Sequence, residues 1–140
     1  MNFRIQTSAE IGAFMKSIFE FGGDRKIWLF EGAMGAGKTT LIKEVCKYLK
    51  IVDAVSSPTF SLVNVYETSS GEECFHFDFY RIEDEMEAVD IGCDEYFYSG
   101  NYCFIEWSER IPNLIPQQYL KINIKLDTEN NRLIELSQHD

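Results

Sequence analysis

Basic side chains are scarce in this sequence. It has 13 Lys and Arg against 23 Asp and Glu, so its formal net charge at pH 7 is −10 over 140 residues. Proteins that bind a nucleic-acid backbone or an anionic membrane surface need clustered Lys and Arg. The balance therefore argues against a protein that holds either polyanion through a broad surface of its own.

The negative charge is concentrated in the second part of the chain. Residues 1–50 contain 8 basic and 5 acidic side chains, whereas residues 51–140 contain 5 basic and 18 acidic ones. The segment 67–109 has 13 acidic side chains and Arg81 as its only base. An acidic run of this kind is typical of a solvated face of a folded protein.

Patterns for zinc binding, secretion and membrane insertion are also missing. No two of the cysteines (Cys46, Cys74, Cys93 and Cys103) are spaced C-x-x-C, and the two histidines complete no zinc pattern. We expect free thiols in the core, which fits a reducing compartment. The N-terminal segment has no signal pattern, and no apolar run approaches the roughly 18 residues of a membrane span. These absences predict a soluble, cytoplasmic protein.

Apolar residues are plentiful enough for one folded domain over residues 1–140. Hydrophobic side chains make up 45% of the chain and aromatic ones 14%, which excludes global disorder, and the length suits a single domain. The first part predicts a strand at 3–6, an amphipathic helix from a Thr7-x-x-Glu10 capping box to Gly22–Gly23, a buried strand at 27–30 and a helix over 38–50.

The remainder of the chain reads mostly as strands. Strands are expected at 60–66 and 74–79 around a turn at 69–72, then an acidic helix at 83–91 and a buried strand at 102–105. Residues 120–126 alternate apolar and polar side chains, a turn follows at 128–131, and an apolar segment at 133–136 completes an antiparallel hairpin with one solvated face.

A glycine-rich loop joins the strand at 27–30 to the helix at 38–50. Residues 32–39 read GAMGAGKT and match G-x-x-x-x-G-K-[ST] in full. Its glycines let backbone N–H groups surround phosphate oxygens, Lys38 adds a charge for the β- and γ-phosphates, and the Thr39 hydroxyl is placed to ligate Mg²⁺. We expect the nucleotide contacts to come from Gly32, Met34, Gly35, Ala36, Gly37, Lys38, Thr39 and Thr40.

A phosphate loop that uses Mg²⁺ needs a carboxylate from a neighbouring strand end. Glu106 directly follows the apolar run at 102–105, and Asp78 ends the strand-like segment Phe75-His76-Phe77-Asp78. Either could instead be a surface acid at a strand terminus, but the phosphate loop makes a site role the stronger hypothesis. Thr59, in Ser57-Pro58-Thr59-Phe60, could reach Mg²⁺ or the γ-phosphate, or could belong to a turn that enters the next strand.

Four motifs together resemble one family. GAMGAGKTT, SSPTFSLVNVYE, HFDFYRI and FIEWSERIP occur here in the order and spacing of TsaE, formerly YjeE, the bacterial P-loop ATPases of tRNA threonylcarbamoyladenosine synthesis. The resemblance covers residues from about 8 to 136. It implies an α/β P-loop domain with a mixed sheet flanked by helices. It also implies ATP or ADP as the ligand, Mg²⁺ as the cofactor, and the TsaB–TsaD pair as partner.

The same resemblance assigns roles to several side chains. Lys38 and Thr39 would hold phosphate and metal, and Thr59 would lie in a switch-like segment. Glu106 would belong to the Mg²⁺ shell and Asp78 would position the attacking water, although these two roles could be exchanged. Trp107, Arg81 and His76 also match the motifs. Trp107 could pack beside the nucleotide or in the core, and His76 fits a core or hydrogen-bonded residue. Arg81 could orient Asp78 or an acid at 83–87, contact a partner, or act as an arginine finger.

Two other functions share a phosphate loop. A small-molecule kinase usually carries an arginine-bearing lid, but only Arg81, Arg110 and Arg132 follow the phosphate-loop helix. A non-hydrolysing nucleotide sensor would bind without turnover, whereas the pair of Asp78 and Glu106 favours turnover. The resemblance thus implies a weak, partner-dependent ATPase, and the charge balance predicts that it contacts tRNA indirectly or through a minor local contact.

Overall fold

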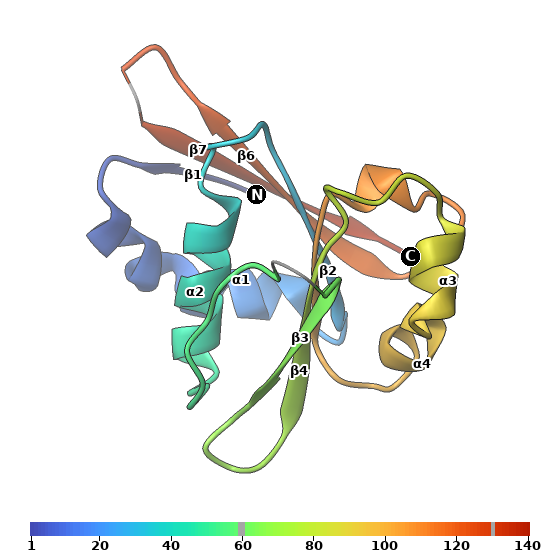
Figure 1. Cartoon of the computed structure of the whole chain (residues 1–140). Coiled ribbons are helices and arrows are strands. Elements are labelled where there is room, and N and C mark those ends of the chain that lie inside the picture. Colours follow the sequence, from blue (N-terminus) through green and yellow to red (C-terminus); the bar gives the residue numbers. More distant parts are fainter. Residues whose placement is uncertain (59–60, 130) are drawn as a thin grey trace.

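A single seven-stranded sheet crosses the molecule, and helices cover both of its faces (Figure 1). The computed structural model describes residues 1–58, 61–129 and 131–140, and for residues 8 and 9 it describes the backbone alone. The strands are β1 (Asn2–Ile5), β2 (Ile27–Glu31), β3 (Val63–Glu67), β4 (Glu73–Asp78), β5 (Cys103–Glu106), β6 (Tyr119–Leu126) and β7 (Arg132–His139). The helices are η1 (Ser8–Phe14), α1 (Met15–Gly22), α2 (Lys38–Tyr48), α3 (Met86–Asp90), α4 (Cys93–Phe97) and η2 (Ser108–Arg110).

The strand order is β1-β7-β6-β2-β5-β4-β3, and the sheet is mixed. The central strand β2 runs parallel to β5 on one side and to β6 on the other, and β4 runs parallel to β5. The outer pairs β3/β4, β6/β7 and β1/β7 are antiparallel. The predicted α/β class, the mixed sheet with helices on both faces and the C-terminal hairpin are confirmed.

Alternation along the central strands separates two apolar layers. Trp28 and Phe30 of β2 pack against α1 and α2, whereas Ile27 and Leu29 pack against α3 and α4. Because both faces of β2 are covered, its sequence is a continuous apolar run. Figure 1 shows α1 and α2 on one face and α3 and α4 on the other.

The first helix begins later than the sequence predicts. Residues 8–14 form the 3-10 helix η1, and the α-helix starts only at Met15. The predicted capping box is wrong, because the Thr7 side chain makes no cap hydrogen bond and the Glu10 carboxylate accepts from the backbone N–H of Gln6 at 3.2 Å. Gly12 lies within this turn, and glycine disfavours the α-helix through its backbone freedom.

The acidic helix is shorter than predicted, and a second helix follows it. Glu87 accepts hydrogen bonds from the backbone N–H groups of Glu83 and Asp84 at 2.7 and 3.1 Å, so α3 starts only after these residues. Gly92, with φ of 77°, separates α3 from α4. The sequence analysis does not predict the helix α4. The strand expected at 60–66 starts at Val63, and its predicted first residue, Phe60, lies outside the described residues.

The described helices are all too short or too polar to cross a membrane.

All four cysteines are free and buried in the apolar layers. Burial raises the pKa of the Cys46 and Cys103 thiols to about 12 and that of the Cys74 and Cys93 thiols to about 11.

We expect native protein at pH 8 to react with a thiol reagent such as iodoacetamide far more slowly than unfolded protein, because the thiolate is the reactive form. Mass spectrometry would count the modified cysteines with and without urea. Rapid labelling of all four thiols in the native protein would contradict this burial.

Candidate functional site

The phosphate loop lies at the edge of the sheet where the parallel strands end. Residues 32–37 leave the end of β2 and enter α2, while Glu106 ends β5 and Asp78 ends β4. Carboxyl ends of parallel strands form the usual ligand site of an open α/β sheet. Here they border a cleft of about 880 Å³, whose lining includes Lys38, Thr39, Asp78, Glu106 and Trp107.

Two glycines of the loop are required by close approaches. A Cβ atom at Gly32 would lie 2.7 Å from the backbone oxygen of Ile124 on β6. Gly37 has φ of 105°, and a Cβ there would lie 2.8 Å from Nε of Arg132. A side chain at Gly32 would push the loop off β6, whereas one at Gly37 would be strained by the positive φ and would displace the Arg132 side chain.

Lys38 is held inside the site. Its side chain is buried, and Nζ donates to the backbone oxygen of Gly32 at 2.8 Å and lies 3.8 Å from the centre of the Trp107 ring. Desolvation lowers the pKa of Lys38, and the nearby carboxylates, Glu106 first among them, oppose this effect. Trp107 thus orients the lysine through a cation–π contact while also packing on the apolar layer below α3 and α4.

The side chains of Thr39 and Glu106 are in contact at the N-terminal end of α2. The Thr39 hydroxyl donates to Oε1 of Glu106 at 3.2 Å and lies 2.8 Å from the hydroxyl of Ser57. Ser57 in turn donates to Oε2 of Glu106 at 3.1 Å. Three oxygen-bearing side chains from distant segments therefore converge on one point.

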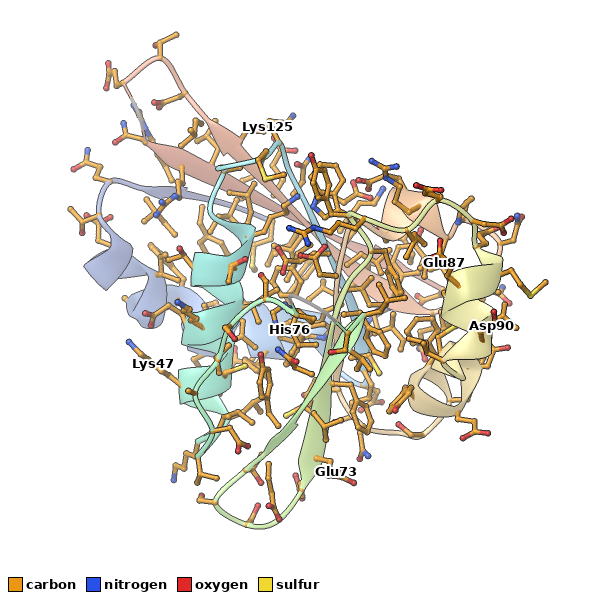
Figure 2. All side chains as sticks on the ribbon, viewed as in Figure 1. Lys47, Glu73, His76, Glu87, Asp90 and Lys125 are labelled. Carbon is orange, nitrogen blue, oxygen red and sulfur yellow. The ribbon has the colours of Figure 1, made fainter. Side chains whose placement is uncertain are left out.

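A buried histidine supports Glu106 from the opposite side. Nε2 of His76 lies 2.8 Å from Oε2 of Glu106, and both residues are almost inaccessible to solvent. Nδ1 of His76 lies 3.0 Å from the hydroxyl oxygen of Tyr66, and that hydroxyl donates to the backbone oxygen of Ser56 at 2.7 Å. Figure 2 shows His76 in the middle of the molecule, whereas the labelled Lys47 and Glu73 lie at its periphery.

These contacts form a closed ring of polar groups. Glu106 contacts His76, His76 contacts Tyr66, and Tyr66 binds the backbone of Ser56. The neighbouring residue Ser57 contacts Thr39, which returns to Glu106. Burial alone would raise the pKa of Glu106, but the hydrogen bonds from His76, Ser57 and Thr39 outweigh it and hold the pKa below its usual value. Glu106 is therefore an ionised, oriented carboxylate.

The period of the strands explains why these side chains share one face. On β4, Phe75 and Phe77 point to the α3 and α4 layer, so His76 and Asp78 project on the α2 side. On β5, Phe104 belongs to the α2 layer, and Glu106, two residues later, lies on the same face. The register pairs Asp78 with Glu106 across neighbouring parallel strands.

Asp78 lies farther out than Glu106. It is half-buried in the cleft wall, and its Oδ1 accepts from the backbone N–H of Tyr80 at 2.9 Å. Desolvation raises the pKa of Asp78, and the Glu106 charge adds to this shift. An acid with a raised pKa beside an ionised carboxylate suits a proton-accepting or water-orienting role.

The other predicted site residues have varied positions. Thr40 lines the cleft, Met34 is largely exposed at its rim, and the buried Ala36 fills the base of the loop. Thr59 lies outside the described residues. Arg81 is exposed at the cleft rim and, within the described part of the chain, forms no ion pair with Asp78 or with the acids at 83–87.

Comparison with known proteins identifies the family of this chain. The family profile described as "Threonylcarbamoyl adenosine biosynthesis protein TsaE" matches residues 5–134. The chain belongs to the TsaE family. The TsaE protein of Bacillus subtilis is 34% identical in an alignment that covers 100% of this chain and 96% of that protein, and the TsaE protein of Treponema pallidum is 31% identical over 94% of each.

A solved structure agrees at the level of the fold. The crystal structure of Bacillus subtilis YdiB superimposes with a TM-score of 0.80 and 29% identity, over 100% of this chain and 86% of that one. The matched region is the whole of this TsaE family member, so it includes both the phosphate loop and the C-terminal hairpin.

Sequence reasoning misses three residues of the site. Ser57 stands two positions before the predicted Thr59, and its contact with Thr39 depends on a crossing of segments that spacing does not show. Tyr66 looks like an ordinary strand residue until β3 pairs with β4. Arg132 opens β7 and reaches the cleft only because the hairpin folds back beside the loop.

We expect His76→Ala to destabilise the protein by about 3–5 kcal/mol, because it leaves the buried Glu106 carboxylate without its main partner. Urea unfolding at pH 7 would measure the loss. His139→Ala, at the end of β7, is the matched control and should cost much less.

The double variant Glu106→Gln/His76→Ala separates the cost of an unpaired Glu106 charge from the cost of lost packing at His76. It should be more stable than the sum of the two single losses implies, because no unpaired charge stays buried. Strict additivity, or a His76→Ala loss no larger than that of the control, would contradict the coupling.

Proposed function

We propose that this protein is a Mg²⁺-dependent ATPase that binds ATP and ADP in the cleft at the head of α2. It supports the TsaB–TsaD complex in forming N6-threonylcarbamoyladenosine at the adenosine beside the anticodon, and its hydrolysis is weak without these partners. The observation that carries the proposal is the buried Lys38 and the Thr39–Glu106 contact at the end of a complete phosphate loop.

The oxygen atoms at the head of α2 fit Mg²⁺. Thr39 and Glu106 supply a hydroxyl and an ionised carboxylate 3.2 Å apart, and both are hard ligands of the kind Mg²⁺ prefers. Across the described ranges, no three His, Cys, Asp or Glu side chains cluster as metal ligands. This suits Mg²⁺ in a nucleotide site, where phosphate oxygens and water complete the shell. The bound ion would neutralise charge between the β- and γ-phosphates.

The chain itself supplies the other parts of the reaction. The ammonium of Lys38 has three N–H donors, so it can keep Gly32 as one acceptor while binding phosphate oxygens with the others. The N–H groups at the start of α2 add their partial positive charge. His76 keeps Glu106 ionised and oriented, and Asp78, at the cleft wall, orients the water that attacks the γ-phosphate.

Partner dependence fits the charge distribution. The phosphate loop lies in the half of the chain with a basic excess, whereas α3 and α4 lie in the acidic segment. A protein with this balance acts on tRNA through a protein partner, and any tRNA contact of its own is small and local.

We expect Lys38→Ala to abolish detectable nucleotide binding or turnover, because the β- and γ-phosphates lose their charged donor. Calorimetric titration with Mg-ADP and phosphate release from ATP, with and without TsaB and TsaD, are the measurements. Lys47→Ala on the exposed face of α2 is the matched control and should behave as wild type. Undiminished hydrolysis by Lys38→Ala would refute the phosphate-loop assignment.

We expect Glu106→Gln and Asp78→Asn to lower ATP hydrolysis in different ways. Loss of a metal-shell carboxylate should raise the Mg²⁺ concentration for half-maximal activity by about tenfold or more. Loss of the water-orienting acid should lower kcat by roughly 10²-fold or more with little change in Mg²⁺ requirement. Titrating Mg²⁺ at saturating ATP in both variants measures this, and the reverse pattern would exchange the two roles.

A further inference from the structure

Lys38 lies among carboxylates with which it forms no ion pair. Desolvation lowers its pKa, and nearby acids oppose this effect, first Glu106, then Glu109 and Asp78. In the part of the chain that the structure describes, however, its Nζ binds the backbone oxygen of Gly32 at 2.8 Å and pairs with none of these acids. A buried lysine and a buried carboxylate in one cleft attract each other strongly, so other contacts must hold them apart.

The ring of Trp107 is the second contact of the Lys38 ammonium. Nζ lies 3.8 Å from the ring centre, and an aromatic face attracts a cation without neutralising its charge. Gly32 and Trp107 together therefore hold the ammonium where it can still donate to a phosphate oxygen. If the ammonium paired with Glu106 instead, both charges that a magnesium nucleotide requires would be neutralised by each other.

The backbone of Trp107 has an unusual conformation. Its φ of 61° and ψ of 43° lie in the left-handed region, where a bulky residue is an outlier because its Cβ approaches a carbonyl oxygen. Such a conformation persists only where the surroundings hold it in place. The carbonyl oxygen of Trp107 accepts from the backbone N–H of Arg110 at 3.1 Å, but this bond does not fix the direction of the indole ring.

The ring of Tyr80 packs against the indole ring of Trp107. The two ring centres are 4.8 Å apart, with 43° between the planes, and the guanidinium of Arg110 lies 5.9 Å from the Tyr80 centre and 6.0 Å from the Trp107 centre. The backbone of Tyr80 is fixed by Asp78, whose Oδ1 accepts from its N–H at 2.9 Å. Tyr80 is therefore placed to support the indole ring that contacts Lys38.

We propose that Tyr80 is a positioning residue: its ring supports Trp107, which keeps the ammonium of Lys38 available for phosphate. This inference rests on the proposed function, since it concerns the lysine of the same site. Without the support, the ammonium turns toward Glu106. Tyr80 acts on nucleotide affinity without touching the nucleotide, because it orders a long, flexible side chain before the ligand arrives. The role requires the aromatic ring and not the hydroxyl.

Calorimetric titration with Mg-ADP tests the proposal on single and double variants. Tyr80→Ala should raise the dissociation constant about 3- to 10-fold, the range expected for a weakened cation–π contact. Tyr80→Phe keeps the ring and should restore the affinity. The double variant Tyr80→Ala/Trp107→Leu should bind as weakly as Trp107→Leu alone, because Tyr80 acts through the indole. Tyr98→Ala, which removes another exposed tyrosine, is the matched control and should bind as wild type.

Proton NMR provides a second measurement that general destabilisation would not reproduce. The indole ring current should shift the ε-methylene protons of Lys38 upfield in folded wild-type protein and in Tyr80→Phe. In folded Tyr80→Ala the signal should move back toward the ordinary lysine position. Comparison with the spectrum of Lys38→Ala assigns the signal.

Three results would overturn the proposal. The first is folded Tyr80→Ala protein with wild-type affinity or an unchanged Lys38 signal. The second is a Tyr80→Phe variant that binds as weakly as Tyr80→Ala, which would assign the effect to the hydroxyl. The third is a double variant in which the two losses add, which would show that Tyr80 acts independently of Trp107. If Tyr80→Ala does not fold, Tyr80→Leu replaces it with the same expectations.

The wild-type titration separates this inference from the function on which it rests. Wild-type protein that does not bind Mg-ADP would refute the proposed function, and the role of Tyr80 with it. Wild-type binding together with an unaffected Tyr80→Ala variant refutes only the role of Tyr80.

Discussion

The site depends on a carboxylate that is buried at the end of a central strand. Glu106 could not remain ionised there by itself, because removing a charge from water is costly. The hydrogen bonds from His76, Ser57 and Thr39 offset that cost and fix the direction of its two oxygens. Each of these three partners comes from a different element, so the carboxylate ties together β4, β5, α2 and the segment before β3.

This arrangement links the Glu106 side of the cleft to the segment before β3. Ser57 contacts both Thr39 and Glu106, and the backbone of Ser56 is bound by Tyr66. A ligand that engages the Thr39 hydroxyl competes directly with its present contact to Ser57. The position of Ser57 is therefore directly coupled to the side chain of Thr39 at the N-terminal end of α2.

Charged side chains from several elements line the cleft. Carboxylates gather on the β4 and β5 side, and the guanidinium of Arg132 lies on the β7 side. Lys38 stands between them, bound to Gly32 and stacked on Trp107. The C-terminal hairpin thus contributes a charged side chain to a cleft that the sequence places at the phosphate loop and the strand ends.

Local patterns in the sequence were sufficient for the phosphate loop, the apolar strands, the C-terminal hairpin and the strand-end acids Asp78 and Glu106, because each depends on neighbours within a few residues. Helix boundaries were harder to predict from the sequence. The start of α1 and the division between α3 and α4 depended on local contacts of Glu10 and Glu87 and on the backbone of Gly92. The tertiary structure alone decided that His76, Tyr66, Ser57 and Arg132 belong to the site. Their contacts join residues that lie 10 or more positions apart, and only the pairing and stacking of the strands bring such segments together.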